Sequence, residues 1–291
     1  MSTINESYLV GLIGDGITAS LTPYLHEAEA AAQGLHYLYR PIDLSMIGRP
    51  GADVGQLLAA GRDLGFNAFN ITYPCKQTVL AYLDQVSDQA QALQAVNTVL
   101  IKDGLFVGHN TDQTGFSSAL ATGLPGVRKE RVFQCGTGGA GSAVAFALLE
   151  SGVQHLTLFD IDGERAAERA TTLRAYFPGA DVTVASDAEL DAEIAHADGV
   201  VNCTPIGMHH HPGTPLDLSL LTSRHWVVEV IYLPIETPLV RHARSLGCRV
   251  LDGGVMAVKQ AADAFRLVTG LEADRERMRT HFLELLAARQ G

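Results

Sequence analysis

A glycine-rich segment, Gly136-Thr137-Gly138-Gly139-Ala140-Gly141, follows a short apolar run and opens a helical pattern. Glycines at this spacing allow a tight turn and a close approach of the backbone to a pyrophosphate, and the following helix offers N–H groups to the phosphates. An acid, Asp160, comes about 20 residues later, where a carboxylate accepts hydrogen bonds from ribose hydroxyls and repels a 2′-phosphate. The pattern therefore predicts a dinucleotide site that favours NAD and disfavours NADP. A tight turn beside an ordinary surface aspartate is the alternative.

Two residues of the first half can together move a proton. Lys76 closes the segment Asn70-Ile71-Thr72-Tyr73-Pro74-Cys75-Lys76, in which a strand ends in polar groups and passes a proline. Asp112 lies in the loop Gly108-His109-Asn110-Thr111-Asp112. Since ligand sites in open α/β sheets lie at the carboxyl ends of strands, we interpret Lys76 and Asp112 as a catalytic pair. A solvated surface lysine and a turn-forming aspartate remain the alternatives.

Ser20 and Thr22 stand just before a helical pattern that contains Pro23. Hydroxyl residues at this place often cap a helix. Two hydroxyls two residues apart in a loop can also both point at a carboxylate. The sequence leaves both interpretations open.

The sequence resembles the shikimate/quinate dehydrogenase family over nearly the whole chain, and the matching segments occur in the same order as in that family. The matching segments are Gly14–Pro23, Asn70–Lys76, Ala95–Thr98, Asn110–Phe116, Asn202–Met208, Ile231–Pro234, Thr237–Leu239 and Gly253–Met256, followed by Gln260. The resemblance implies that Ser20 and Thr22 hold the substrate carboxylate. It implies that the ring hydroxyls are met by Thr72, Lys76, Asn97, Asp112 and Gln260. It also implies that Tyr232 lies near the substrate and that the nicotinamide end is met by Thr204, Val230 and Gly253.

The first loop departs from the family pattern. The family usually has Asn-Pro after the first glycine and a histidine before the first serine, whereas this chain has Asp15-Gly16 and Ala19. Thr22 replaces a second serine, and Thr22 together with Asp160 is more similar to the NAD-dependent quinate/shikimate branch. The resemblance thus implies an NAD-dependent oxidoreductase that interconverts shikimate or quinate with a 3-dehydro ketone. An aminoshikimate-like cyclitol acid as substrate, or a non-catalytic dinucleotide sensor of the same fold, is the alternative.

The elements that must position these residues alternate between apolar runs and amphipathic stretches. We expect strands at Tyr8–Ile13, Ala68–Thr72, Val132–Cys135, Leu156–Asp160, Val182–Ala185, Gly199–Cys203, Val227–Tyr232 and Arg249–Asp252. We expect helices at Pro23–Gly34, Gln77–Leu83, Ser142–Ser151 and Arg165–Tyr176, and a helix pair from about Val255 to Ala288. This alternation predicts an α/β fold with an N-terminal α/β substrate domain, whose sheet is mostly parallel, and a Rossmann-type doubly wound NAD-binding domain. We place the substrate domain at 1–115, completed by the C-terminal helices 256–291, and the dinucleotide domain at 116–255.

The composition bounds the class of protein. The chain has 291 residues, which suggests about two domains, and a formal net charge of −11, which argues against nucleic-acid binding. No apolar run reaches the roughly 20 residues of a membrane helix, and Met1–Leu9 has no secretory pattern, so we expect a cytoplasmic protein. Four scattered cysteines indicate reduced thiols, and His209–His211 indicates a polar loop, so no metal is expected. The expected partner is a small cyclitol carboxylate, and a homodimer is compatible with the sequence.

Overall fold

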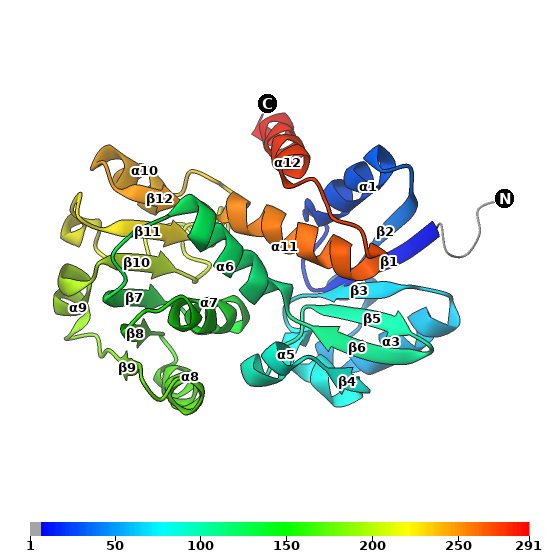
Figure 1. Ribbon diagram of the computed structural model, residues 1–291, viewed down its shortest axis with the longest axis horizontal. Coiled ribbons are helices and arrows are strands. Elements are labelled where there is room, and N and C mark those ends of the chain that lie inside the picture. Colours follow the sequence, from blue (N-terminus) through cyan, green and yellow to red (C-terminus); the bar gives the residue numbers. More distant parts are fainter. Residues whose placement is uncertain (1–6, 291) are drawn as a thin grey trace. The chain divides into compact units, whose positions relative to one another are not determined.

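The computed structural model describes residues 7–290, and the chain divides into two compact units (Figure 1). Unit 1 comprises Met1–Thr111 and Val258–Gly291, and unit 2 comprises Asp112–Ala257. The chain passes between the units inside two helices, α6 (Thr111–Gly123) and α11 (Gly253–Thr269). Unit 1 is therefore built from two separate stretches of sequence, whereas unit 2 is continuous.

Unit 1 contains a mixed sheet with the strand order β2-β1-β3-β5-β6-β4. Its strands are β1 (Ser7–Gly14), β2 (His36–Asp43), β3 (Ala68–Ile71), β4 (Gln85–Val86), β5 (Thr98–Lys102) and β6 (Leu105–His109). β1 pairs in parallel with β2 and β3, as expected for a parallel sheet, but β5 runs antiparallel to β3 and β6. The hairpin between β5 and β6 turns through Asp103 and Gly104, whose φ angles of 52° and 79° are those that a tight two-residue turn requires.

Helices cover both faces of the unit 1 sheet. They are α1 (Thr22–Ala32), α2 (Leu44–Ile47), α3 (Val54–Asp63), α4 (Cys75–Thr78), α5 (Asp88–Leu93), the unit 1 part of α11 and α12 (Arg275–Gln290), with the short 3-10 helices η2 (Gly51–Asp53) and η3 (Val79–Tyr82). Successive strand residues point to opposite faces, so Ile13 packs in one core with Leu58 of α3, and Leu12 packs in the other with Phe265 of α11. The helix expected at Gln77–Leu83 is wrong in its bounds, because the segment forms α4 and η3 instead.

Unit 2 is a parallel sheet with the order β12-β11-β10-β7-β8-β9. Its strands are β7 (Arg131–Cys135), β8 (His155–Phe159), β9 (Asp181–Val184), β10 (Gly199–Asn202), β11 (Trp226–Glu229) and β12 (Arg249–Leu251). Its helices are α6, α7 (Gly139–Glu150), α8 (Gly163–Tyr176), α9 (Leu190–His196) and α10 (Pro238–Ser245), with the 3-10 helix η4 (Leu218–Leu220). The strand expected at Val227–Tyr232 ends at Glu229, so Tyr232 lies in the loop that follows.

The strand order of unit 2 identifies its fold. Counted from β7, the order is 3-2-1-4-5-6, which is the doubly wound arrangement of dinucleotide-binding sheets. The order reverses between β7 and β10, and ligands of such sheets bind in the crevice at the carboxyl ends of the strands at this point. The predicted α/β fold class is therefore confirmed. Within residues 7–290, no helix combines the length and the apolar character needed to cross a bilayer.

Candidate active site

One edge of the unit 1 sheet collects the polar loops of the first half. β1, β2 and β3 are parallel, so their carboxyl ends lie together, with Gly14 level with Asp43. β5 runs the other way, and Thr98 at its start pairs with Asn70, so Asn97 reaches the same edge. The predicted substrate residues that this edge carries are Ser20, Thr22, Thr72, Lys76 and Asn97.

The loop after β1 and the loop after β3 meet at Gly14. A Cβ atom there would lie 2.2 Å from the Thr72 Cγ2 atom, so the approach requires glycine. The Asp15 N–H donates to the Tyr73 carbonyl over 2.8 Å, and the Thr72 N–H donates to the Ile13 carbonyl over 2.9 Å. The predicted carboxylate loop and the predicted ring-binding Thr72 are therefore neighbours.

Ser20 and Thr22 lie where β1 leads into α1. Leu21 is the N-cap residue of α1, and its own side chain makes no capping hydrogen bond. Thr22 is the first residue of α1, so a hydroxyl that meets its N–H serves the start of this helix. The Ser20 Oγ atom accepts the Thr22 N–H over 3.2 Å, which leaves the Ser20 O–H proton able to donate elsewhere. Carboxylate binding by the two hydroxyls stays a prediction.

Lys76 and Asn97 are held along the same edge. Lys76 is half-buried in α4, and its carbonyl accepts the Val96 N–H over 2.8 Å. The buried Asn97 accepts the Thr111 N–H at Oδ1 over 2.8 Å and donates from Nδ2 to the Thr111 hydroxyl over 3.0 Å. Asp112 is buried in the first turn of α6 and is the first residue of unit 2. Its pairing with Lys76 stays a prediction.

Gln260 lies on the part of α11 that belongs to unit 1, where it is half-buried. The same helix is anchored further along by Phe265, whose ring centroid lies 5.8 Å from that of Tyr37 and 6.1 Å from that of His26. The helix is thus fixed on one face of the unit 1 sheet. The contact of Gln260 with ring hydroxyls stays a prediction.

The glycine-rich segment forms the turn between β7 and α7. Gly136 has a φ of 90°, and a Cβ there would lie 2.8 Å from the carbonyl carbon of Cys203. At Gly141 a Cβ would lie 2.2 Å from the Gly136 oxygen. Gly138 is the N-cap of α7, and a Cβ there would meet no described atom within 4 Å. The first N–H groups of a helix lack partners within it, so this turn offers donors and open space to an anion.

Asp160 is fixed against this turn by several donors. Its Oδ2 atom accepts the Thr137 N–H over 2.7 Å and the Thr137 hydroxyl over 2.8 Å, and its Oδ1 atom accepts the Asp162 N–H over 3.0 Å. Arg165 donates to both carboxylate oxygens and also pairs with Asp162. Burial opposes ionisation of Asp160, but the hydrogen bonds from Arg165 and the two N–H groups hold its pKa below the usual value. An arginine therefore adjoins Asp160, although it is five residues further along the chain.

The loops after β10, β11 and β12 carry the remaining predicted cofactor residues. The Thr204 hydroxyl donates to Asn202 Oδ1 over 2.7 Å, and the Val230 N–H donates to the Asn202 carbonyl over 3.1 Å. A Cβ at Gly253 would lie 2.4 Å from the Val230 oxygen, so glycine is required there. The half-buried Tyr232 follows in the same loop as Val230. These residues lie at the carboxyl edge of the sheet, where a doubly wound fold binds its ligand.

A buried carboxylate that the sequence analysis missed ties these loops together. Glu229 accepts hydrogen bonds from Asn202 Nδ2 and the Thr237 hydroxyl, both over 2.9 Å, and from the Ile231 N–H over 3.1 Å. Burial raises the pKa of Glu229 to about 7, and these hydrogen bonds act in the opposite direction. Glu229 ends an apolar run, and a charged residue in that position could have indicated a buried carboxylate at the end of the strand.

Gln134 was also missed. Its side chain is buried in β7, and Nε2 donates to the carbonyls of Gly136 and Gly141 over 2.8 Å each. The two ends of the glycine-rich turn are thus held by one amide. A glutamine inside a buried apolar strand was the signal that could have identified it.

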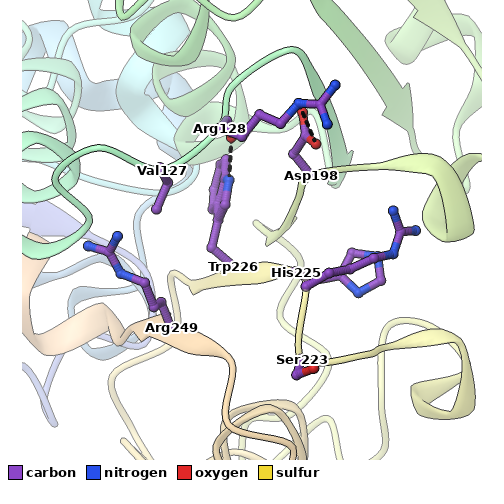
Figure 2. Close-up of a pocket in the computed structure, with 8 residues that line it drawn as sticks. Val127, Arg128, Asp198, Ser223, His225, Trp226 and Arg249 are labelled. Atoms are coloured by element: carbon purple, nitrogen blue, oxygen red, sulfur yellow. Dashed lines mark hydrogen bonds and ion pairs between the residues drawn. The ribbon is translucent and has the colours of Figure 1, made fainter.

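A pocket of about 200 Å³ lies elsewhere in unit 2 (Figure 2). Its walls come from Val127, Arg128, Asp198, Ser223, Arg224, His225, Trp226 and Arg249. Arg128 pairs with Asp198 over 3.4 Å, and the Trp226 indole N–H donates to the Arg128 carbonyl over 2.8 Å. These residues lie at or before the amino ends of β7, β10, β11 and β12, opposite to the glycine-rich turn, so the pocket is separate from the predicted cofactor residues.

The arrangement of the potential metal ligands bears on whether a metal site is present. Over the described part of the chain, no group of three or more His, Cys, Asp or Glu side chains is arranged to hold a metal ion. His209, His210 and His211 are exposed in the loop after β10. This loop contains a backbone hydrogen bond of 2.7 Å from the Gly207 N–H to the His211 carbonyl.

Residues 12–99 match the family model described as "Shikimate dehydrogenase substrate binding domain". The chain is 60% identical over 290 residues to a shikimate dehydrogenase (NADP(+)) of Arthrobacter sp. (strain FB24), an alignment that covers 100% of this chain and 99% of the relative. It is 51% identical over 283 residues to a quinate/shikimate dehydrogenase (NAD(+)) of Corynebacterium efficiens, covering 97% and 99% of the two chains.

Among solved structures, quinate dehydrogenase from Corynebacterium glutamicum in complex with NAD is similar with a TM-score of 0.91. The identity is 49%, and the match covers 96% of this chain and 99% of that chain. Both the sequence and the fold are therefore shared along almost the entire length.

Proposed function

Because the chain belongs to the shikimate dehydrogenase family, we propose that it interconverts shikimate, and quinate, with their 3-dehydro ketones, using NAD. The observation that carries the proposal is the polar edge of the unit 1 sheet, where the loops of Ser20 and Thr22, of Thr72 and Lys76, and of Asn97 meet. Hydroxyl donors suit a carboxylate, and amide, hydroxyl and ammonium groups suit ring hydroxyls.

Lys76 is the proposed carrier of the proton. In the oxidation direction its amine accepts the proton of the reacting hydroxyl, and in the reduction direction its ammonium group returns a proton to the ketone oxygen. Asp112 is the proposed partner that orients Lys76. Thr72, Asn97 and Gln260 are proposed to hold the ring hydroxyls so that the reacting carbon is presented in one orientation. Tyr232 is proposed to adjoin the substrate.

Unit 2 suits a dinucleotide. The left-handed Gly136, the close approach at Gly141 and the open space at Gly138 make a turn that larger residues would fill. The first N–H groups of α7 are available to an anion at this turn. We propose that the pyrophosphate is held there by Gly136, Gly138, Gly139, Ala140 and Gly141. Thr204, Val230 and Gly253 are proposed to line the nicotinamide end. When bound, the nicotinamide accepts or supplies the hydride, and the protein supplies orientation.

We propose that Asp160 makes the protein prefer NAD over NADP. Its carboxylate lies beside the turn in the place that meets the adenosine ribose, and a 2′-phosphate there would meet a like charge. Arg165 reduces this repulsion, because its guanidinium already pairs with Asp160 and Asp162. Relatives carry names with either cofactor. We propose that the balance between Asp160 and Arg165 sets the preference of this chain.

The proposal is tested by steady-state kinetics on a matrix of substrates and cofactors. Shikimate, quinate and an aminoshikimate are each combined with NAD and with NADP, and dinucleotide reduction is followed by absorbance. Reduction with shikimate or quinate is the expected result. Reduction with the amino compound alone would replace the substrate assignment, and dinucleotide binding without reduction by any cyclitol acid would indicate a sensor.

The proposed compartment is the cytoplasm. All four cysteines are free thiols, and Cys75, Cys135 and Cys248 are buried. Burial raises the pKa of each of these thiols, which keeps them protonated and unreactive. A chain with this cysteine usage suits a reducing compartment.

A further inference from the structure

A buried carboxylate at the end of β2 holds the loop that follows β1. Asp43 is 5% exposed. Its Oδ2 atom accepts the N–H groups of Ile17 over 2.8 Å and Thr18 over 3.2 Å. Its Oδ1 atom accepts the N–H groups of Gly16 and Ser45, each over 3.2 Å. Three successive loop N–H groups and the first turn of α2 therefore converge on one side chain.

This arrangement depends on the loop's departure from the Asn-Pro pattern. Gly16 has a φ of 64° and donates its N–H to Asp43. A proline at position 16 has no N–H and is confined to a negative φ, so it can neither make this bond nor adopt this conformation. Asp15 adds a second tie, because its carboxylate accepts a hydrogen bond from the Ser45 hydroxyl. The Asp15-Gly16 pair and the 43–45 segment thus form one hydrogen-bonded unit.

The same unit determines where Ser20 stands. Ile17 is held by Asp43, and the Ile17 carbonyl accepts the Ser20 N–H over 2.9 Å. Ser20 Oγ in turn accepts the Thr22 N–H. Because the N–H groups of residues 16–18 are already directed at Asp43, a ligand carboxylate at this loop must rely on the hydroxyls.

We propose that Asp43 is a positioning residue that sets the hydroxyls of Ser20 and Thr22 for the substrate carboxylate. The inference rests on the proposed function of that loop. Asp43 does not touch the substrate, and it acts by fixing the backbone of residues 16–18. An asparagine cannot replace it, since its amide offers one acceptor oxygen and turns an NH₂ group toward N–H donors.

The test compares the kcat/KM for shikimate with that for its methyl ester, and also measures the dinucleotide KM and the thermal midpoint. The variants are Asp43→Asn and, as an independent route to the same loop, Gly16→Pro. Gly16→Asn is the matched control, because it keeps the N–H, tolerates a positive φ and meets open space. Asp84→Asn is a second control in unit 1, where Asp84 accepts the Phe106 N–H over 2.7 Å away from this loop.

Asp43→Asn and Gly16→Pro are expected to reduce the acid-to-ester ratio about tenfold or more, because a misplaced hydroxyl loses a bond to a charged group. The dinucleotide KM is expected to stay within about twofold, and both controls to keep the wild-type ratio. If Asp43→Asn does not fold, Gly16→Pro against Gly16→Asn decides the question.

The variant Ser20→Ala distinguishes the positioning role of Asp43 from the proposed binding of the carboxylate by this loop. If Ser20→Ala lowers the acid-to-ester ratio while Asp43→Asn and Gly16→Pro leave it unchanged, the positioning role is overturned and the proposed function stands. If Ser20→Ala itself leaves the ratio unchanged, the loop does not bind the carboxylate, and the positioning role is overturned with that assignment.

Discussion

The turn after β1 in unit 1 and the turn after β7 in unit 2 are each held by an aspartate from the end of the neighbouring strand. In unit 1, Asp43 accepts the N–H groups of residues 16–18. In unit 2, Asp160 accepts the N–H and hydroxyl of Thr137. The two turns differ in which hydrogen-bond donors are left for a ligand.

The unit 1 turn directs its successive N–H groups at the protein's own carboxylate, so side-chain hydroxyls are left to bind a ligand anion. The unit 2 turn gives Asp160 one N–H group. The first N–H groups of α7 are the proposed donors to a phosphate. Asp160 also has a cationic partner in Arg165. On the proposed function, recognition in unit 1 depends on side-chain identity, whereas recognition in unit 2 depends on backbone shape and one charge.

Removing the proposed proton carrier is expected to separate the two regions most strongly. Lys76→Ala should lower kcat by at least about 10²-fold while the dinucleotide affinity stays near wild type, because the loss is confined to chemistry at the unit 1 edge. Stopped-flow kinetics and dinucleotide titration measure the two quantities. Lys102→Ala, an exposed lysine of β5, is the control. Retention of most of the activity in Lys76→Ala would rule out the assignment, and Asp112→Asn should also lose chiefly kcat.

The role of Asp160 beside the turn after β7 is tested by two substitutions that are expected to change the preference for NAD over NADP in opposite directions. Wild type is expected to prefer NAD by roughly 10²-fold in kcat/KM, or about 2.7 kcal/mol. Asp160→Ser should narrow this gap, chiefly by weakening NAD, and Arg165→Ala should widen it by removing the cation that screens Asp160. The measurement is kcat/KM for both cofactors at saturating shikimate or quinate. Equal or better use of NADP by the wild type would contradict the proposed preference.

The hydroxyls of the first turn should respond to the substrate and not to the cofactor. Ser20→Ala and Thr22→Ala should each raise KM for the acid by about 10- to 100-fold, since a hydrogen bond to a charged group contributes roughly 1.5–3 kcal/mol. The methyl ester should show a much smaller change. Mutants that discriminate acid from ester as well as wild type does would show that this loop binds something else.

The smallest expected effect is on stability and concerns Glu229. Its pKa of about 7 lies above the ordinary value of 4.5, so its contribution to stability is full at low pH and is lost as the pH rises through about 7. Between pH 6 and 7 the wild type should lose about 1 kcal/mol relative to Glu229→Gln, in which this titration is absent. Chemical denaturation of both proteins at a series of pH values measures the difference. A difference that does not vary with pH would contradict a buried, titrating Glu229.

The buried parallel strands were predictable, and so was the turn that joins β7 to α7. Their apolar runs and glycine spacing are local signals. The β5–β6 hairpin was missed although Asp103-Gly104 is a strong local turn signal, because its flanking residues were assigned to ligand loops. β2 was also missed, since His36–Asp43 alternates and contains Pro41.

The roles of Asp43 and Gln134 were beyond the sequence for a different reason. Asp43 meets residues 16–18 only because the parallel register sets it level with Gly14, and register is a property of the folded sheet. Gln134 acts on two carbonyls that the turn itself brings together. The proximity of Arg165 to Asp160 could have been predicted, because Arg165 lies in the first turn of the helix that Asp162 caps.

The two stretches that build unit 1 are completed at very different times during synthesis. Unit 2 leaves the ribosome as one continuous piece, with all six of its strands available before Val258 is made. Unit 1 lacks Phe265 of its core until then, and its buried Glu29 waits for Arg277, which donates from Nε and Nη2 over 2.8 Å and 2.7 Å. In a chain that ends before Val258, Glu29 lacks the guanidinium that pairs with it in the complete structure, and the core around Tyr37 lacks Phe265. Since unit 1 is incomplete until its second stretch is made, we expect unit 2 to be able to complete its fold before unit 1 does.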